Sequence, residues 1–137
     1  MTKTDLFVFD TNILISAFIL PDSNARKALN KARQNGQLVI SRETANEFTN
    51  VLIRPKFDKY LPLEERLEVI DDFISLAYAI QPKTTITICR DPKDNKFLEL
   101  AFDASAKCIV TGDQDLLVLH PFGDIPIMTP FDFLSCV

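Results

Sequence analysis

The chain has 137 residues and a formal net charge of −4, and hydrophobic residues make up 47% of it. This composition fits one globular domain over residues 1–137 and excludes a disordered chain. No apolar run reaches the roughly 18–20 residues that span a bilayer, and the first ten residues lack a signal-peptide pattern. We therefore expect a soluble cytoplasmic protein that makes no contact with a membrane. The three scattered cysteines contain no CxxC pair, which argues against a zinc site or a disulfide framework.

Hydrophobic periodicity in the first half predicts strands that alternate with helices. The strands are expected at 6–9 and 38–40, and the helices at 12–19, 24–35, 41–53 and 62–80. Gly36 is a good stop for the second helix, and Pro55 ends the third. The long fourth helix is amphipathic, and its predicted apolar side carries Leu63, Leu67, Ile70, Ile74 and Ala77.

The second half continues the alternation. Residues 84–89 are β-branched and predicted to be extended, and Asp91-Pro92 is a strong start for a helix that runs to about residue 105. Further strands are predicted at 108–111 and 125–128, before a last helical turn at 130–134. This order indicates an α/β fold with a mostly parallel sheet, in which ligands bind beyond the carboxyl ends of the strands.

Acidic residues fall where such a site is expected. Asp10 follows the first strand, and Glu47 lies in the helix after the second. Asp113 and Asp115 follow the strand at 108–111, and Asp94 lies at the start of the helix before it. The parallel topology allows acids that are far apart in sequence to converge in one cleft.

Each acid also has an ordinary structural interpretation. Asp10 can cap the following helix, and Glu47 can complete a capping box with Thr44. Asp113 and Asp115 lie in a GDQD stretch, where aspartate is common in turns. Asp94 is harder to explain in this way, because helical spacing places it on the face that carries apolar side chains at 97, 98 and 101.

Taken together, the acids predict a metal site. Clustered carboxylates repel one another, and a hard cation that prefers oxygen ligands relieves that repulsion. Mg²⁺ or Mn²⁺ held in this way can activate water and stabilise a leaving oxygen in phosphodiester hydrolysis.

Four stretches, "FVFDTNILISA", "SRETANEFTNVL", "DPKDNKFLELA" and "IVTGDQDLL", together resemble the PIN domain family. They occur in the family's order and extend over most of the chain. The closing "IPIMTPFDFL" resembles the end of a VapC-like subgroup, the toxins of toxin–antitoxin systems. The resemblance implies a three-layer α/β/α sandwich and a Mg²⁺- or Mn²⁺-dependent endoribonuclease that leaves a 5′-phosphate and a 3′-hydroxyl.

The resemblance also implies roles for individual residues. The four family acids correspond to Asp10, Glu47, Asp94 and Asp113, which would be catalytic. Metal would be held by Asp10, Asp94, Asp113 and Asp115, and Glu47 would help to bind it or orient the attacking water. Asn12 and Thr111 match polar positions that border the family's site.

The segment 54–80 is longer and more helical than in the shortest family toxins, and we expect it to form a helical arm beside the cleft. Arg54, Lys56 and Lys59 are interleaved with Phe57 and Tyr60, a pattern that can grip single-stranded RNA. The same pattern also fits an ordinary solvated loop with aromatic anchors.

Other functions remain open on the sequence alone. A non-catalytic PIN-like module would use the same cleft to hold RNA or a protein. A receiver domain or a DxD-type phosphatase fits less well, because "DTN" supplies only one acid after the first strand and no matching receiver lysine is found. A toxin would have an antitoxin protein as its partner, and homodimers are common in the family.

Overall fold

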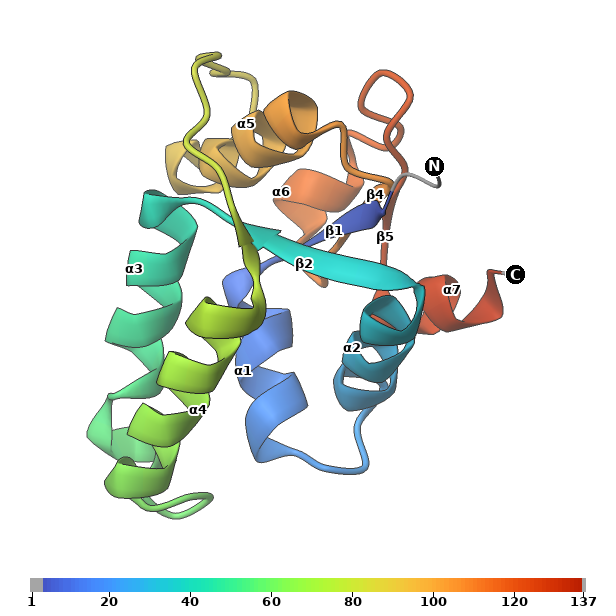
Figure 1. Ribbon diagram of the computed structural model, residues 1–137. Helices are drawn as coiled ribbons and strands as arrows, with labels where there is room; N and C mark the ends of the chain where they lie inside the picture. Colours follow the sequence, from blue (N-terminus) through green and yellow to red (C-terminus); the bar gives the residue numbers. More distant parts are fainter. Residues whose placement is uncertain (1–3, 137) are drawn as a thin grey trace.

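A parallel sheet forms the centre of the computed structural model, which describes residues 4–136 (Figure 1). Its five strands lie in the order β3-β2-β1-β4-β5, and each pair of neighbours is parallel. The strands are β1 (Asp5–Phe9), β2 (Gly36–Ile40), β3 (Tyr78–Ala79), β4 (Cys108–Val110) and β5 (Ile127–Met128). The predicted α/β fold with a mostly parallel sheet is confirmed.

Helices cover both faces of the sheet. One face carries α1 (Thr11–Ile19), α2 (Asn24–Asn35), α3 (Arg42–Leu52), α4 (Leu63–Leu76) and α7 (Pro130–Ser135). The other carries α5 (Asn95–Ala104) and α6 (Gln114–Leu117), as Figure 1 shows. Two short 3₁₀ turns are also present: η1 (Pro55–Phe57) lies between α3 and α4, and η2 (Pro92–Asp94) directly precedes α5. No described helix is long and apolar enough to cross a membrane.

Side-chain alternation along β1 creates the two halves of the core. Phe7 and Phe9 point to the side of α1, α2 and α7, where both rings pack edge-on against Phe133. Val8 points to the opposite side and packs with the apolar face of α5. Because both faces are covered, the strand is continuously apolar from Leu6 to Phe9, and Asp10 follows directly after it.

The long helix predicted at 62–80 is wrong at its carboxyl end. Helix α4 ends at Leu76, because Tyr78 and Ala79 pair with β2 as the edge strand β3. Much of the predicted apolar side is also exposed: Leu63 is 45% exposed, Leu67 46% and Ile74 39%.

The buried side of α4 instead begins with a charged residue. Arg66, Ile70 and Phe73 lie at helical spacing and are buried, and Arg66 is fully buried. Its guanidinium donates to the carbonyls of Leu61 (2.8 Å) and Leu52 (2.7 Å), and it also pairs with Asp58. A hydrophobic pattern does not detect an arginine that is buried and hydrogen-bonded to backbone carbonyls at the end of α3. The predicted apolar side of the helix is therefore wrong.

The extended segment at 84–89 forms no strand in the structure. It lies along α5, where three side chains spaced four residues apart accept its backbone N–H groups. Asp103 accepts from the amide of Thr84 (3.0 Å), Glu99 from that of Ile86 (2.9 Å) and Asn95 from that of Cys89 (2.9 Å). The extended backbone is therefore stabilised by a helix rather than by the sheet, and it leads directly into the loop that carries Asp91.

Candidate metal and nucleic-acid site

A polar cleft opens where β1 and β4 end. Its walls come from the starts of α1 and α6, the middle and end of α3, and the η2 turn with the start of α5. The lining residues are Asp10, Thr11, Asn12, Glu47, Val51, Arg54, Asp91, Lys93, Asp94, Phe97 and Asp113. Four of the predicted acids therefore lie on one cleft, together with Asn12 and Arg54.

Asp10 has both a structural position and a place on the cleft. It is the N-cap of α1, where one carboxylate oxygen accepts from the amide of Ile13 (2.9 Å) and the other from the hydroxyl of Thr111. The side chain is buried. Burial raises the pKa of Asp10, the hydrogen bonds from Thr111 and Ile13 oppose this, and the charges of Asp113 and Glu47 raise it further.

Thr111 joins two of the acids. Its hydroxyl donates to Asp10 and accepts from the backbone amide of Asp113 (3.0 Å). Asp113 is in turn the N-cap of α6 and accepts from the amide of Asp115 (2.9 Å). The GDQD pattern predicts a turn here and not α6, because a helix of four residues has too little periodicity to detect.

Asp94 is in the least favourable environment of these acids. It ends the η2 turn, and its Oδ2 atom is buried with no hydrogen-bond partner within the described residues. Its pKa is raised to about 7, first by burial, then by the adjacent Asp113 carboxyl and the charge of Asp91, while Lys96 opposes the shift. An unpartnered buried carboxylate oxygen is costly unless a positive group meets it.

The chemistry of this donor set fits a hard divalent cation. Asp94, Asp113 and Asp115 each offer a ligand atom, and these atoms all lie within 4.8 Å of one another. The residue with the unpartnered oxygen, Asp94, belongs to this trio. Oxygen ligands alone, without histidine or cysteine, favour Mg²⁺ or Mn²⁺ over zinc. Asp10 and Glu47 lie on the same cleft but outside the trio.

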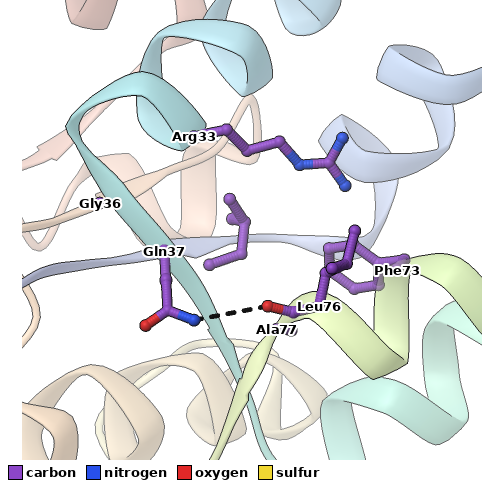
Figure 2. Close-up of a pocket in the computed structure, with 7 residues that line it drawn as sticks. Arg33, Gly36, Gln37, Phe73, Leu76 and Ala77 are labelled. Atoms are coloured by element: carbon purple, nitrogen blue, oxygen red, sulfur yellow. Dashed lines mark hydrogen bonds between the residues drawn. The ribbon is translucent and has the colours of Figure 1, made fainter.

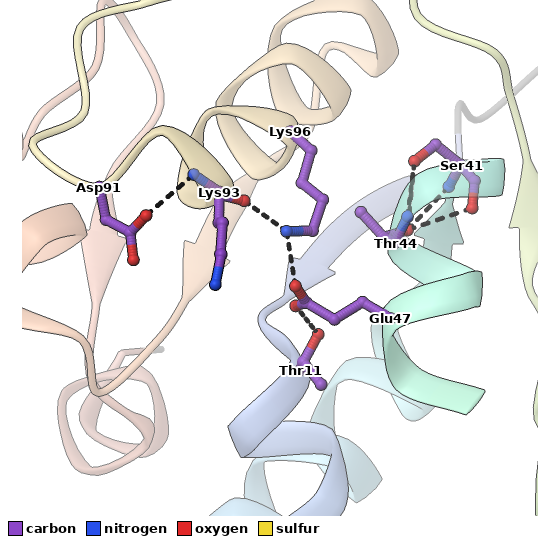
Figure 3. A network of polar contacts seen from close by, with 7 residues as sticks. All are labelled: Thr11, Ser41, Thr44, Glu47, Asp91, Lys93 and Lys96. Carbon is purple, nitrogen blue, oxygen red and sulfur yellow. Dashed lines mark hydrogen bonds and ion pairs between the residues drawn. The ribbon is translucent and has the colours of Figure 1, made fainter. Parts of the chain in front are cut away.

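Glu47 is held by two other elements (Figure 3). One oxygen accepts from the hydroxyl of Thr11 in α1, and the other pairs with the ammonium of Lys96 in α5 at 2.7 Å. The capping box of α3 is formed by Ser41 and Thr44, so the alternative in which Glu47 completes that box with Thr44 is wrong. The side chain of Glu47 is thus not used to cap α3, and it lines the cleft.

Basic residues on the cleft only partly match the predicted ones. Arg54 lines it, whereas Lys56 and Lys59 do not and lie over the rings of their neighbours Phe57 and Tyr60. Lys93 also lines the cleft, and Lys96 pairs with Glu47, but the sequence pattern did not single out either lysine. Both lie in "DPKDNK", where lysines alternate with the site's acids, a pattern that could have marked them.

A second hollow lies between β2 and α4 (Figure 2). It is lined by Arg33, Gln37, Phe73 and Leu76, among others, and the Gln37 amide donates to the Leu76 carbonyl at 3.5 Å. Its walls are largely apolar and carry no carboxylate. It therefore lacks the chemistry that distinguishes the acidic cleft.

Solved structures support the architecture. The fold is similar to VapBC2 from Rickettsia felis, solved bound to a promoter DNA fragment, with a TM-score of 0.62 and 15% identity over 89% of this chain and 96% of the other. PAE2754 from Pyrobaculum aerophilum gives a TM-score of 0.62 and 14% identity over 96% and 88% of the two chains. VapBC-1 from nontypeable Haemophilus influenzae gives a TM-score of 0.59 and 17% identity, over 92% of this chain and 98% of the other.

Sequence comparison supplies the family. An uncharacterized protein from Methanocaldococcus jannaschii is 37% identical over 115 residues, which are 82% of this chain and 74% of the relative. Residues 7–115 match the family described as PIN domain, and this range contains every acid of the cleft and of the trio. The chain therefore belongs to the PIN domain family.

Proposed function

We propose that this protein is a Mg²⁺- or Mn²⁺-dependent endoribonuclease. The observation that carries the proposal is the trio Asp94, Asp113 and Asp115, whose ligand atoms lie within 4.8 Å of one another. One oxygen of Asp94 is also buried without a partner among the described residues. Clustered carboxylates of this kind are unfavourable alone and become favourable around a divalent cation. Asp113 and Asp115 follow β4, beside the cleft at the carboxyl ends of β1 and β4, and such an edge of a parallel sheet is where ligands bind.

The acids divide into groups with different tasks. In this proposal Asp94, Asp113 and Asp115 bind the metal, and Asp10 adds its charge beside them while it fixes Thr111. Bound metal lowers the pKa of a water and stabilises charge on the phosphate oxygens. Glu47 orients the water that attacks the phosphodiester, and the products carry a 5′-phosphate and a 3′-hydroxyl.

RNA would lie across the cleft in contact with Arg54 and Lys93. Their positive charges attract the phosphates of RNA and partly offset the repulsion from the acids. Asn12, exposed at the start of α1, would supply a further polar contact. Lys56 and Lys59 are then secondary contacts at most, because they point onto their own aromatic neighbours.

The proposal extends to the biological setting. We propose that the chain is a VapC-like toxin, that an antitoxin protein blocks its cleft, and that it forms a homodimer. The fold likeness to two VapBC proteins supports the first two points. Exposed leucines and isoleucine on α4 are compatible with a homodimer, because such residues favour protein contacts. A cytoplasmic location stays a prediction from the sequence.

The test is an RNA-cleavage assay with purified protein in Mn²⁺, Mg²⁺ and EDTA. Asp94→Asn and Asp113→Asn should lower the rate at least about a hundredfold, since metal-site contributions to catalysis amount to several kcal/mol. Asp71→Asn, an exposed residue of α4, is the matched control and should cut at the wild-type rate.

End-group analysis should show 5′-phosphates. Cleavage that survives EDTA or both site variants would contradict the proposal. Tight binding of RNA or of a protein without any cleavage would favour the non-catalytic module instead.

A further inference from the structure

The ion pair between Lys96 and Glu47 joins α5 to α3 beside the acidic cleft. Glu47 comes from α3 and lines the cleft, and Lys96 comes from α5 and is not among the lining residues. The Lys96 ammonium also donates to the carbonyl of Lys93 in the η2 turn. Figure 3 shows Glu47 between the Thr11 hydroxyl and this ammonium. Side chains of α1 and α5, which are distant in sequence, thus hold one carboxylate of α3.

Both oxygens of Glu47 are engaged, in contrast to the unpartnered Oδ2 of Asp94. Side-chain exposure is 16% for Lys96 and 31% for Glu47, so water screens this pair less than a surface pair. Within the described residues, Glu47 does not join the group of carboxylates able to hold a metal together.

We infer that Lys96 is a positioning residue, which holds Glu47 away from the metal and directs it towards the reacting water. This inference rests on the proposed function. It divides the acids into a metal-binding trio and a separate, lysine-held carboxylate. It also assigns a role to a lysine that no other part of the proposal uses.

The first test measures Mn²⁺ affinity by calorimetry and needs no cleavage. Asp94→Asn should weaken Mn²⁺ binding at least about tenfold, whereas Glu47→Gln should change it less than about threefold, since each tenfold change equals about 1.4 kcal/mol. Lys96→Met releases Glu47 towards the metal and should tighten Mn²⁺ binding. The gain in Mn²⁺ affinity caused by Lys96→Met should be at least about threefold larger in the protein that has Glu47 than in the Glu47→Gln variant.

Two controls separate positioning from folding and from general charge. Lys96→Arg keeps the cation and should restore wild-type affinity and cleavage. Lys107→Met removes an exposed lysine, paired with Asp5 at 3.6 Å and absent from the cleft, and should leave Mn²⁺ affinity unchanged. Thermal melting of each variant checks that it is folded.

In RNA cleavage, Lys96→Met and Glu47→Gln should each lower kcat more than they raise KM, and the double variant should be no slower than the worse single one. The inference would be overturned if Lys96→Met changed Mn²⁺ affinity by the same factor in the wild-type protein and in the Glu47→Gln variant. A loss of affinity in Glu47→Gln that matches Asp94→Asn would also overturn it, because Glu47 would then be a ligand.

The two proposals fail in different ways. A wild type that binds Mn²⁺ but cuts no RNA would remove the proposed nuclease activity, and the Mn²⁺ measurements would still decide the role of Lys96. A wild type that binds no Mn²⁺ would overturn both.

Discussion

At the scale of single residues, Thr111 connects the two loops that carry the acids of the cleft. Its hydroxyl satisfies Asp10 and the amide of Asp113, and the side chain has no exposed surface. A buried polar group that loses its partner retains the full cost of its desolvation. One oxygen atom therefore links Asp10 to Asp113, in addition to the β1–β4 pairing and the backbone bond from Asp10 to Val110.

Replacement of Thr111 by valine tests this link. Thr111→Val should destabilise the protein by about 1–3 kcal/mol in urea unfolding, because it leaves the Asp10 oxygen and the Asp113 amide without partners. RNA cleavage should fall at least about tenfold. Thr111→Ser keeps the hydroxyl and should retain most of the activity. Equal stability of the valine and wild-type proteins would show that the hydroxyl bonds contribute nothing.

Asp94 gives the metal-free protein a specific dependence on pH. Its pKa is raised from 3.8 to about 7 in the folded protein, so the folded state holds a proton that the unfolded chain releases. Stability therefore falls as pH rises from about 4 to about 7, and the loss persists above that range.

Asp94→Asn removes this ionisation. With EDTA at pH 8, the variant should be more stable than wild type by about 1 kcal/mol, a modest gain because partial exposure to solvent screens the repulsion. The gain should shrink at pH 5, where wild-type Asp94 is protonated. Denaturant unfolding at the two pH values measures it, and a gain independent of pH would contradict this explanation. Asp71→Asn should show no such change.

At the scale of elements, Gly36 shows how a correct boundary can have an unexpected cause. The residue does end α2, as predicted, but its φ of 174° is extended rather than left-handed. A Cβ atom here would lie 2.0 Å from the carbonyl oxygen of Asp5, its partner in the β1–β2 pairing. Glycine is needed because the two backbones approach closely.

Gly36→Ala should therefore push β1 and β2 apart and destabilise the protein by about 1–3 kcal/mol. Gly112→Ala is the control, because a Cβ atom there meets only the Ile13 Cδ1 atom at 3.8 Å. Its unfolding midpoint should stay close to that of wild type. Urea unfolding of both variants measures the difference, and equal midpoints would rule out the backbone contact as the reason for glycine.

The sequence pattern predicts elements well where apolar periodicity or capping residues set them. Helix α2 occurs as predicted at 24–35, and Asp91-Pro92 begins a helical segment with Asp91 as its N-cap. Prediction fails where polar side chains do the packing. Arg66 replaces a hydrophobic residue on the buried side of α4, and Asn95, Glu99 and Asp103 replace a neighbouring strand for residues 84–89.

The candidate site was partly predictable for a related reason. The topology of a parallel sheet brings the residues after β1 and β4 together, so Asp10 and Asp113 could be expected to be neighbours. Other contacts depend on the directions of side chains from separate helical segments, and the spacing of residues in the sequence does not determine those directions. These are the contacts of Thr11, Lys93 and Lys96.

At the scale of the whole molecule, the acids of the cleft become neighbours only when the chain is folded. They come from the loop after β1, from α3, from η2 and from the start of α6, and the segments between them form much of the core. A metal that needs several of these carboxylates binds the folded state and not the unfolded chain, so binding must stabilise the fold.

This linkage gives a prediction that is independent of any RNA substrate. Mn²⁺ at about 100 times its Kd should stabilise the wild type by about 2.7 kcal/mol, which corresponds to a rise in Tm of several degrees for a domain of this size. Asp94→Asn and Asp113→Asn should lose most of this rise, while Asp71→Asn and Lys107→Met should keep it. Calorimetric melts with Mn²⁺ and with EDTA measure the shift. An undiminished rise in Asp94→Asn would mean that Mn²⁺ binds elsewhere on the protein, and the acidic cleft would lose its assignment as the metal site.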